Sequence, residues 1–379
     1  MSDLYPRNPF VVGKYVSDNY FCDRVKETEF LRKQILNGRD VALISPRRMG
    51  KSGLIQHFFN QSSIREEYYV FFVDIYSTTS LAEFVYLFGK EIYELLKPQK
   101  TQWKEKFFQV ISSFRVGFKL DAMSGAPSFD LGLGDIHAPQ STLDEIFNYI
   151  EEADKPCIIA IDEFQQISEY PEKNVEALLR TQIQRCKKAQ FVFSGSKRHL
   201  MNNMFNSPSK PFYQSVISMG LDPIPMDEYA KFALRMFEQR GKGLDVDVVN
   251  VVWRQFDGYT WYVQMVMNEL FSMTEKGSQC DKTMIADAYA NIIHVQEGSY
   301  KNILSQLAPR QKVVLQAIAK EGNACNITSA KFIGKYNLGT ASSVQAAVKS
   351  LVNNDLITVE NGIYRVSDYF FSTWLATDY

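Results

Sequence analysis

A short segment at residues 45–52 contains the residue types of a phosphate-binding loop. It reads S-P-R-R-M-G-K-S and matches the motif except that Ser45 replaces the usual first glycine. In such a loop, backbone N–H groups at a helix start hold phosphate oxygens, the lysine reaches the terminal phosphates and the hydroxyl binds Mg²⁺. The alternative is an ordinary strand-to-helix turn whose basic side chains are solvated. The motif predicts nucleotide contacts from Pro46, Arg47, Arg48, Met49, Gly50, Lys51, Ser52 and Gly53.

Two acidic residues follow an apolar segment further along the chain. The sequence C-I-I-A-I-D-E occupies residues 157–163 and ends in Asp162 and Glu163. A carboxylate at the end of a strand beside a phosphate loop can hold Mg²⁺, and the next carboxylate can orient and deprotonate the attacking water. We therefore expect Ser52 and Asp162 to bind the metal and Glu163 to act with Lys51 in catalysis. The alternative is that the two acids only cap the next helix.

A third apolar segment ends in hydroxyl groups. The sequence Q-F-V-F-S-G-S occupies residues 190–196, and Ser194 or Ser196 could contact the terminal phosphate or the attacking water. Serine is also a favoured helix cap, so both interpretations stay open. One of the basic residues that follow could neutralise charge in the transition state, although each could equally be a solvated surface residue. These basic residues are Lys197, Arg198 and Lys210.

Strand-like and helix-like segments alternate around these residues. Short apolar runs typical of buried parallel strands lie at 41–45, 69–76, 157–162 and 190–196. Helical patterns lie at 24–37, 50–60, 81–97, 141–153 and 172–188. This order predicts an α/β P-loop NTPase core, with a parallel sheet and helices on both faces.

The pattern changes at two boundaries, which divide the chain into three parts. Residues 1–222 form the predicted core, with a β-hairpin insertion at about 98–140, where 114–121 and 127–135 alternate polar and apolar residues. Residues 223–296 contain three helical patterns and predict an all-helical, lid-like domain. Residues 297–379 contain three further helices and a final hairpin pattern, which predict a winged helix.

Composition narrows the class of protein. The chain has 379 residues, 45% of them hydrophobic, which is enough to build sizeable cores. A net charge of -1 indicates no overall attraction to nucleic acid or to an anionic membrane. The five cysteines are scattered, which argues against a zinc site or disulfide framework, and no apolar run is long enough to cross a membrane. These features favour a cytoplasmic protein.

With these motifs the chain resembles a known family, the archaeal-type ATPases of the STAND branch of AAA+-like P-loop NTPases. That family occurs in archaea and in Bacteroidetes-like bacteria, and the resemblance covers nearly the whole chain. It rests on F-C-D-R (21–24), S-P-R-R-M-G-K-S (45–52), I-I-A-I-D-E-F-Q-Q (158–166), F-S-G-S (193–196), G-Y-T-W-Y-V-Q (258–264) and V-S-D-Y-F-F-S-T-W-L (366–375).

The resemblance implies an ATPase core, a helical domain and a winged helix similar to those of origin-recognition ATPases. It also implies ATP or ADP and Mg²⁺ as ligands, Arg24 near the base or ribose, and a switch-like or scaffold use of ATP. Two departures stand out: Val25 replaces a frequent glutamate, and P-F-Y-Q-S (211–215) lacks the arginine of many relatives. The second departure predicts slow or partner-dependent hydrolysis of ATP to ADP and phosphate.

Two other functions remain open. The helical pattern at 340–355 could enter a DNA groove, but it carries only one basic residue, Lys349, and winged helices also dock proteins. A scaffold that binds nucleotide without turnover is the other alternative, with the hairpin insertion as a possible site for a protein partner.

Overall fold

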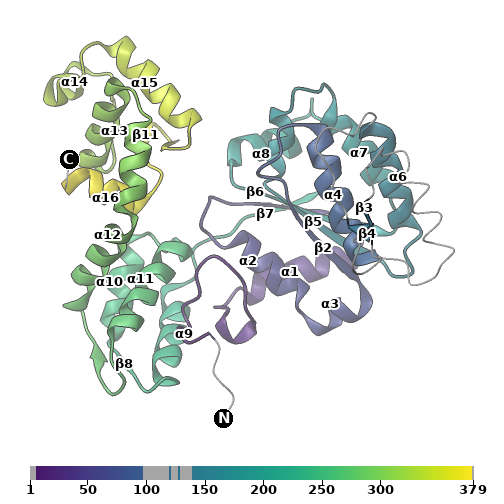
Figure 1. The fold of residues 1–379 in the computed structure, drawn as a ribbon, viewed down its shortest axis with the longest axis horizontal. Coiled ribbons are helices and arrows are strands. Elements are labelled where there is room, and N and C mark those ends of the chain that lie inside the picture. Colours follow the sequence, from purple (N-terminus) through teal and green to yellow (C-terminus); the bar gives the residue numbers. More distant parts are fainter. Residues whose placement is uncertain (1–5, 97–118, 121–126, 129–138, 378–379) are drawn as a thin grey trace. The chain divides into compact units, whose positions relative to one another are not determined.

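The structure is a computed structural model of the full chain, and it describes residues 6–96, 119–120, 127–128 and 139–377. It divides into two compact units (Figure 1). One is Gly13–Ile224, and the other combines Met1–Val12 with Pro225–Tyr379. The chain therefore passes twice from one unit to the other.

A five-stranded parallel sheet forms the centre of Gly13–Ile224. The strand order is β2-β5-β6-β1-β7, so the first strand in sequence lies between two later ones. Every residue of β5 is buried, as the run of β-branched side chains predicts for a central parallel strand. The strands are β1 (Val41–Ile44), β2 (Tyr69–Asp74), β5 (Cys157–Asp162), β6 (Ala189–Gly195) and β7 (Ile217–Met219).

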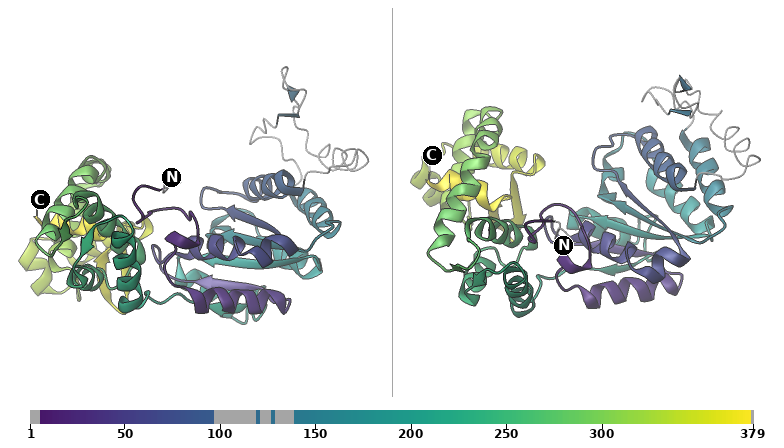
Figure 2. Two further views of the ribbon diagram at one scale, coloured as in Figure 1. Left: turned by 90° about the horizontal axis from the view of Figure 1, so that it is seen from below. Right: turned by 60° about the horizontal axis from the view of Figure 1, so that its bottom comes forward.

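Helices cover both faces of this sheet. Alternate strand residues such as Ile159 and Phe193 share a core with the apolar face of α4, while Val41 and Leu43 are buried on the opposite side. Figure 2 shows α1 and α2 on one side of the sheet and α4 and α6 on the other. The predicted α/β core is confirmed. Its helices are η1 (Asp18–Tyr20), α1 (Val25–Leu36), α2 (Lys51–Phe59), α3 (Ser62–Glu67), α4 (Leu81–Leu96), α6 (Pro139–Glu151), η2 (Phe164–Glu169), α7 (Val175–Arg185) and α8 (Arg198–Asn206).

The predicted hairpin insertion lies mostly outside the described residues. Its described part is an antiparallel pair, β3 (Lys119–Leu120) with β4 (Pro127–Ser128). These four residues fall within or beside the two segments of alternating polarity.

The second unit is mainly helical. It contains α9 (Met226–Glu238), α10 (Val246–Gln255), α11 (Thr260–Met273), α12 (Met284–Ser305), α13 (Pro309–Glu321), α14 (Ala330–Tyr336), α15 (Ala341–Asn353) and α16 (Tyr369–Thr377), with two small sheets of β8 (Gly243–Leu244) with β9 (Gln279–Cys280) and β10 (Ile357–Glu360) with β11 (Ile363–Val366). The antiparallel β10–β11 pair follows three helices, as expected of a winged helix. The boundary expected at 296–297 lies inside α12, which is one continuous helix.

The start of the chain joins this helical unit, whereas the sequence-based division placed it with the core. Phe10 is fully buried, with ring centroids 5.9 Å from Phe232, 5.6 Å from Phe237 and 5.8 Å from Phe271. Asn8 Nδ2 also donates a hydrogen bond to the Asn268 carbonyl at 2.8 Å. Burial of one large aromatic ring fixes residues 6–12 on α9 and α11.

None of the helices in the described residues has both the length and the apolar character needed to cross a bilayer.

Candidate functional site

The phosphate-binding loop lies between β1 and α2. Gly50 has a φ of 90°, a left-handed conformation that glycine adopts without the steric cost of a Cβ, and α2 begins at the next residue. The loop thus turns so that the N-terminal N–H groups of α2 face outward from the helix start, the arrangement that binds anions. The sequence motif therefore lies in the local structure that it needs.

Lys51 lies over this loop. Its Nζ donates hydrogen bonds to the carbonyl oxygens of Ser45 at 2.9 Å and Pro46 at 3.0 Å, and the residue is only 6% exposed. Burial lowers the pKa of Lys51, while the carboxylates of Glu163 and Asp162 act in the opposite direction. The predicted lysine and both predicted acids are therefore close enough to interact.

Asp162 connects two of the predicted hydroxyl groups. Ser52 Oγ donates a hydrogen bond to Asp162 Oδ2 at 2.6 Å, and Ser194 Oγ donates to Asp162 Oδ1. Asp162 is 5% exposed at the end of β5. A hydroxyl and a carboxylate are hard oxygen donors, which are the ligands that Mg²⁺ prefers. The donor set at this point fits a magnesium ion.

Glu163 is held in an unusual backbone conformation. Its φ is 55° and its ψ 41°, the left-handed region that costs a residue with a Cβ roughly 1–2 kcal/mol. Its Oε2 accepts hydrogen bonds from Ser196 Oγ at 2.7 Å and from Gln165 Nε2. The carboxylate is thus fixed by two donors at the carboxyl edge of the sheet.

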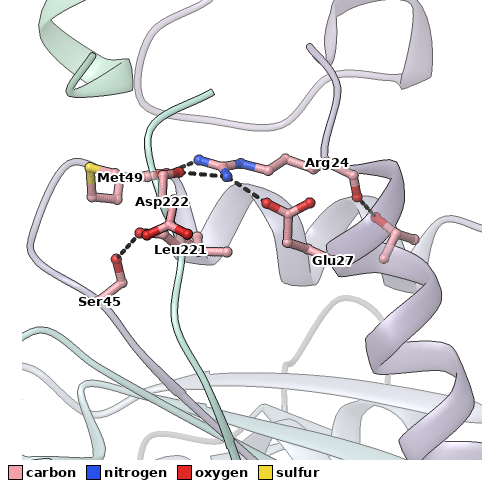
Figure 3. A network of polar contacts seen from close by, with 7 residues as sticks. Arg24, Glu27, Ser45, Met49, Leu221 and Asp222 are labelled. Atoms are coloured by element: carbon pink, nitrogen blue, oxygen red, sulfur yellow. Dashed lines mark hydrogen bonds and ion pairs between the residues drawn. The ribbon is translucent and has the colours of Figure 1, made fainter. Parts of the chain in front are cut away.

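Arg24 lies beside the loop (Figure 3). Its Nη1 donates to Glu27 Oε1 at 2.6 Å and to the Asp222 carbonyl at 2.7 Å, and its Nη2 donates to the Met49 carbonyl at 3.3 Å. The side chain is almost fully buried. Arg24 therefore connects the start of α1, the phosphate loop and the segment after β7.

The remaining candidates surround this centre. Met49 is 3% exposed, and Gly53 lies within α2, where an added Cβ would meet the Phe21 ring at 3.6 Å. The Arg47 guanidinium lies 5.5 Å from the centre of the Tyr76 ring. Pro46 offers its carbonyl to Lys51, and Arg48 has a φ of 70° in the turn.

Two of the three basic residues after β6, Lys197 and Lys210, form ion pairs with acidic residues outside the predicted site. Lys197 Nζ lies 2.8 Å from Glu169 Oε1, and Lys210 Nζ lies 2.7 Å from Glu176 Oε1. Arg198 is the first residue of α8. In this structure neither lysine forms its ion pair with Glu163 or Asp162.

Sequence reasoning missed two side chains at this site. Gln165 is buried and donates to Glu163, although D-E-F-Q was noted only as a family mark. Asp74 ends β2 and pairs in register with Asp162 on β5. Desolvation, and to a lesser extent Asp162 and Glu163, raise the pKa of Asp74. The sequence already showed that the predicted strand at 69–76 carries an aspartate near its carboxyl end, and this pattern could have identified Asp74 as a site residue.

Comparison of the fold with solved structures finds several similar chains. A Walker-type ATPase of Pyrococcus abyssi has 18% sequence identity and a TM-score of 0.64, covering 97% of this chain and 99% of that chain. The ORC2 protein of Aeropyrum pernix, in ADPNP and ADP complexes, has 14% identity and a TM-score of 0.59, covering 98% and 96%. The ORC1 protein of the same organism, in complex with DNA, has 12% identity and a TM-score of 0.55, covering 94% and 93%. At these identities the likeness shows a shared fold.

Family comparison is more specific. No curated protein matches the chain in sequence. Residues 298–377 match a probable winged helix domain, which confirms the predicted C-terminal architecture. Residues 21–266, more than half of the chain, match the ATPase domain predominantly from Archaea. The archaeal-type ATPase resemblance noted from the motifs is thereby confirmed, and the chain belongs to this family of ATPases.

Proposed function

We propose that the protein binds ATP and ADP with Mg²⁺ and works as a slow, ATP-driven molecular switch or scaffold of the STAND type. The observation that carries this proposal is the hydrogen bond of 2.6 Å between Ser52 Oγ and Asp162 Oδ2. It joins the hydroxyl of the phosphate loop to the carboxylate at the end of β5, which supports a single site built from both motifs.

The geometry supports a binding role for each of these residues. The N-terminal N–H groups of α2, which starts at Lys51, hold phosphate oxygens, and the ammonium of Lys51 offsets their negative charge. Ser52 and Asp162 would hold Mg²⁺, which would stabilise charge on the phosphate oxygens. Ser194 fixes the Asp162 carboxylate by donating to its second oxygen.

Hydrolysis depends on Glu163. Its carboxylate accepts the proton of the attacking water, and Ser196 and Gln165 hold it in one orientation. Restricting that orientation favours a productive geometry of base and water.

Slow or partner-dependent turnover is consistent with the surrounding charges. Lys197 and Lys210 are paired with Glu169 and Glu176, and residues 211–215 contain no arginine. A cation that stabilises the transition state would then come from a partner or from a rearrangement of these pairs.

Calorimetric titration of the full chain tests binding. We expect ADP and ATP to bind in the presence of Mg²⁺, and Lys51→Ala to weaken binding by about 100-fold or more. Phosphate release tests turnover, which should collapse in Glu163→Gln while binding is kept. Wild-type protein that binds neither nucleotide would refute the proposal, whereas binding without any phosphate release would favour the scaffold without turnover.

DNA binding is the second candidate. The winged helix presents exposed Gln345 and Lys349 on α15, and polar side chains at such a surface can contact base edges. The solved ORC1 protein with this fold was captured with DNA. Gel shifts over a range of salt concentrations decide, because phosphate contacts are strongest at low salt. No shift at low salt would exclude this candidate.

A further inference from the structure

The phosphate loop is connected to one distant segment of the same unit at two points, once directly through Ser45 and once through the Arg24 side chain. Ser45 Oγ donates a hydrogen bond to the Leu221 carbonyl at 3.1 Å, and Ser45 is 1% exposed. At the other end of the loop, the Arg24 guanidinium joins the carbonyls of Met49 and Asp222. Figure 3 shows the bond from Ser45 to Leu221 and the bonds by which Arg24 bridges Met49 and Asp222.

This segment lies at a particular place in the chain. The chain crosses between the two units after Val12 and again after Ile224. We call residues 221–224 the linker segment because they directly precede the second crossing. Arg24 lies twelve residues after the first crossing, and its bond to Asp222 reaches the segment that precedes the second crossing.

The backbone around Arg24 is also constrained. Asp23 and Arg24 have φ values of 55° and 64°, two consecutive left-handed residues that carry side chains. Such conformations are unfavourable and persist only where surrounding contacts hold them. The Arg24 carbonyl accepts hydrogen bonds from Thr28 N at 2.9 Å and Thr28 Oγ1 at 2.7 Å, which contribute to holding the turn. The guanidinium is thereby aimed from a fixed backbone position.

The serine at position 45 is the distinctive part of this arrangement. A glycine, the usual residue at the start of the motif, has no side chain to reach Leu221. Because the hydroxyl and the carbonyl are both buried, breaking this bond leaves two polar groups without access to water. If the loop moves when it binds phosphate, the linker segment therefore has to move with it, or the hydrogen bond from Ser45 to Leu221 breaks.

We propose that Ser45 and Arg24 are positioning residues that couple the phosphate loop to the linker segment, so that nucleotide binding changes the orientation of the helical unit. This inference rests on the proposed function, since it requires that the loop binds nucleotide. Ser45 couples the loop directly to Leu221. Arg24 holds the loop and the linker segment together both with and without bound nucleotide.

Energy transfer between two dyes on the full chain measures this coupling. Cys325 is exposed in the helical unit, and Glu67→Cys adds an exposed label in the other unit. A control sample without the Glu67→Cys substitution measures how much dye attaches to the other native cysteines. We expect MgADP to change the transfer efficiency in the otherwise wild-type protein, and Ser45→Gly to reduce that change to less than about half.

Matched variants separate coupling from binding. Ser45→Gly should bind ADP within about 3-fold of wild type, because glycine is the usual residue of the motif. Ser45→Thr keeps the hydroxyl and should retain the full ADP-dependent change. Arg24→Lys keeps the charge but replaces the two separate Nη donors, which reach Asp222 and Met49, by one Nζ on a shorter side chain, and it should reduce the change as well.

The outcomes are distinct. A full ADP-dependent change in Ser45→Gly would overturn the coupling role, as would ADP binding to the wild type with no change in transfer. Absence of ADP binding to the wild type in calorimetry would overturn both this inference and the proposed function. Loss of ADP binding in Ser45→Gly alone would make Ser45 a nucleotide-binding residue and would overturn its role as a coupling residue.

Discussion

Ser196 Oγ donates a hydrogen bond of 2.7 Å to Glu163 Oε2. The two residues lie at the ends of neighbouring parallel strands, so the sheet itself sets their separation. Ser196→Ala should lower kcat for ATP hydrolysis by about 10-fold, because Glu163 loses one of two donors that orient it. ADP affinity should stay within about 3-fold, since Ser196 holds the base and not the ligand. Equal loss of kcat and affinity would argue against this role, and Ser209→Ala at an exposed position is the control.

The left-handed backbone of Glu163 predicts a difference in stability between two inactive variants. Both Glu163→Gly and Glu163→Ala should abolish phosphate release, because both remove the carboxylate. Glycine adopts a φ of 55° without a Cβ clash, so Glu163→Gly should be more stable than Glu163→Ala by about 1 kcal/mol. Urea denaturation measures the difference. Equal stability of the two variants would show that this conformation is not strained.

The effect of Mg²⁺ on ATP affinity should depend on the hydroxyl of Ser52. Chelation of divalent ions should weaken ATP binding by about 10-fold or more in the wild type, because Ser52 and Asp162 then lose the cation between them and the phosphates. Ser52→Ala should bind ATP weakly with or without Mg²⁺, so chelation should change its affinity little. Calorimetric titration with and without EDTA checks this. A full chelation effect in Ser52→Ala would remove Ser52 from the metal site.

Asp40 predicts a specific pH dependence of stability. Burial raises the pKa of this carboxyl from 3.8 to about 6, although Phe191 N donates to it and Arg180 is near. The folded protein therefore binds the proton more tightly than the unfolded chain, and the destabilising contribution of Asp40 grows as pH rises from about 4 to 6. Asp40→Asn keeps an acceptor for Phe191 and should be about 1–2 kcal/mol more stable at pH 7.5.

That advantage of Asp40→Asn should shrink as pH falls towards 4, because the wild-type carboxyl then becomes protonated. Urea denaturation at several pH values measures it, with exposed Asp227→Asn as the control. A difference that stays constant from pH 4 to 8 would contradict the assignment.

Phe10 predicts how strongly the start of the chain supports the helical unit. Its ring fills a site among Phe232, Phe237 and Phe271, so Phe10→Ala should destabilise that unit by about 3–5 kcal/mol. Phe10→Leu keeps most of the volume and should cost less. Denaturation followed by tryptophan fluorescence and limited proteolysis of residues 6–12 reports both effects. An unchanged unfolding curve for Phe10→Ala would contradict this packing.

The sequence predicted the parts of the structure that local pattern determines. Apolar runs located β1, β2, β5 and β6, and the lysine-containing motif lies between β1 and α2 as expected. Parallel strands bring their carboxyl ends to one edge of the sheet, which is why Asp162, Glu163 and Ser196 could be grouped without coordinates.

Contacts between distant segments could not be predicted in this way. The three-residue strand β7 has no clear apolar run, yet it pairs with β1 and brings Leu221 to Ser45. Likewise, one phenylalanine among many gave no sign that Phe10 would be buried between α9 and α11. These contacts depend on how separate elements pack, and local periodicity contains no information about that packing.

The helical unit is built from two separate segments of the chain, and this also sets the order in which its parts are synthesised. Phe10 leaves the ribosome long before α9 and α11 exist, whereas all of residues 13–224 can fold before those helices are made. The site that buries Phe10 is therefore complete only after Phe271 has been added. Residues 6–12 can thus pack on α9 and α11 only after the intervening residues 13–224 have been synthesised.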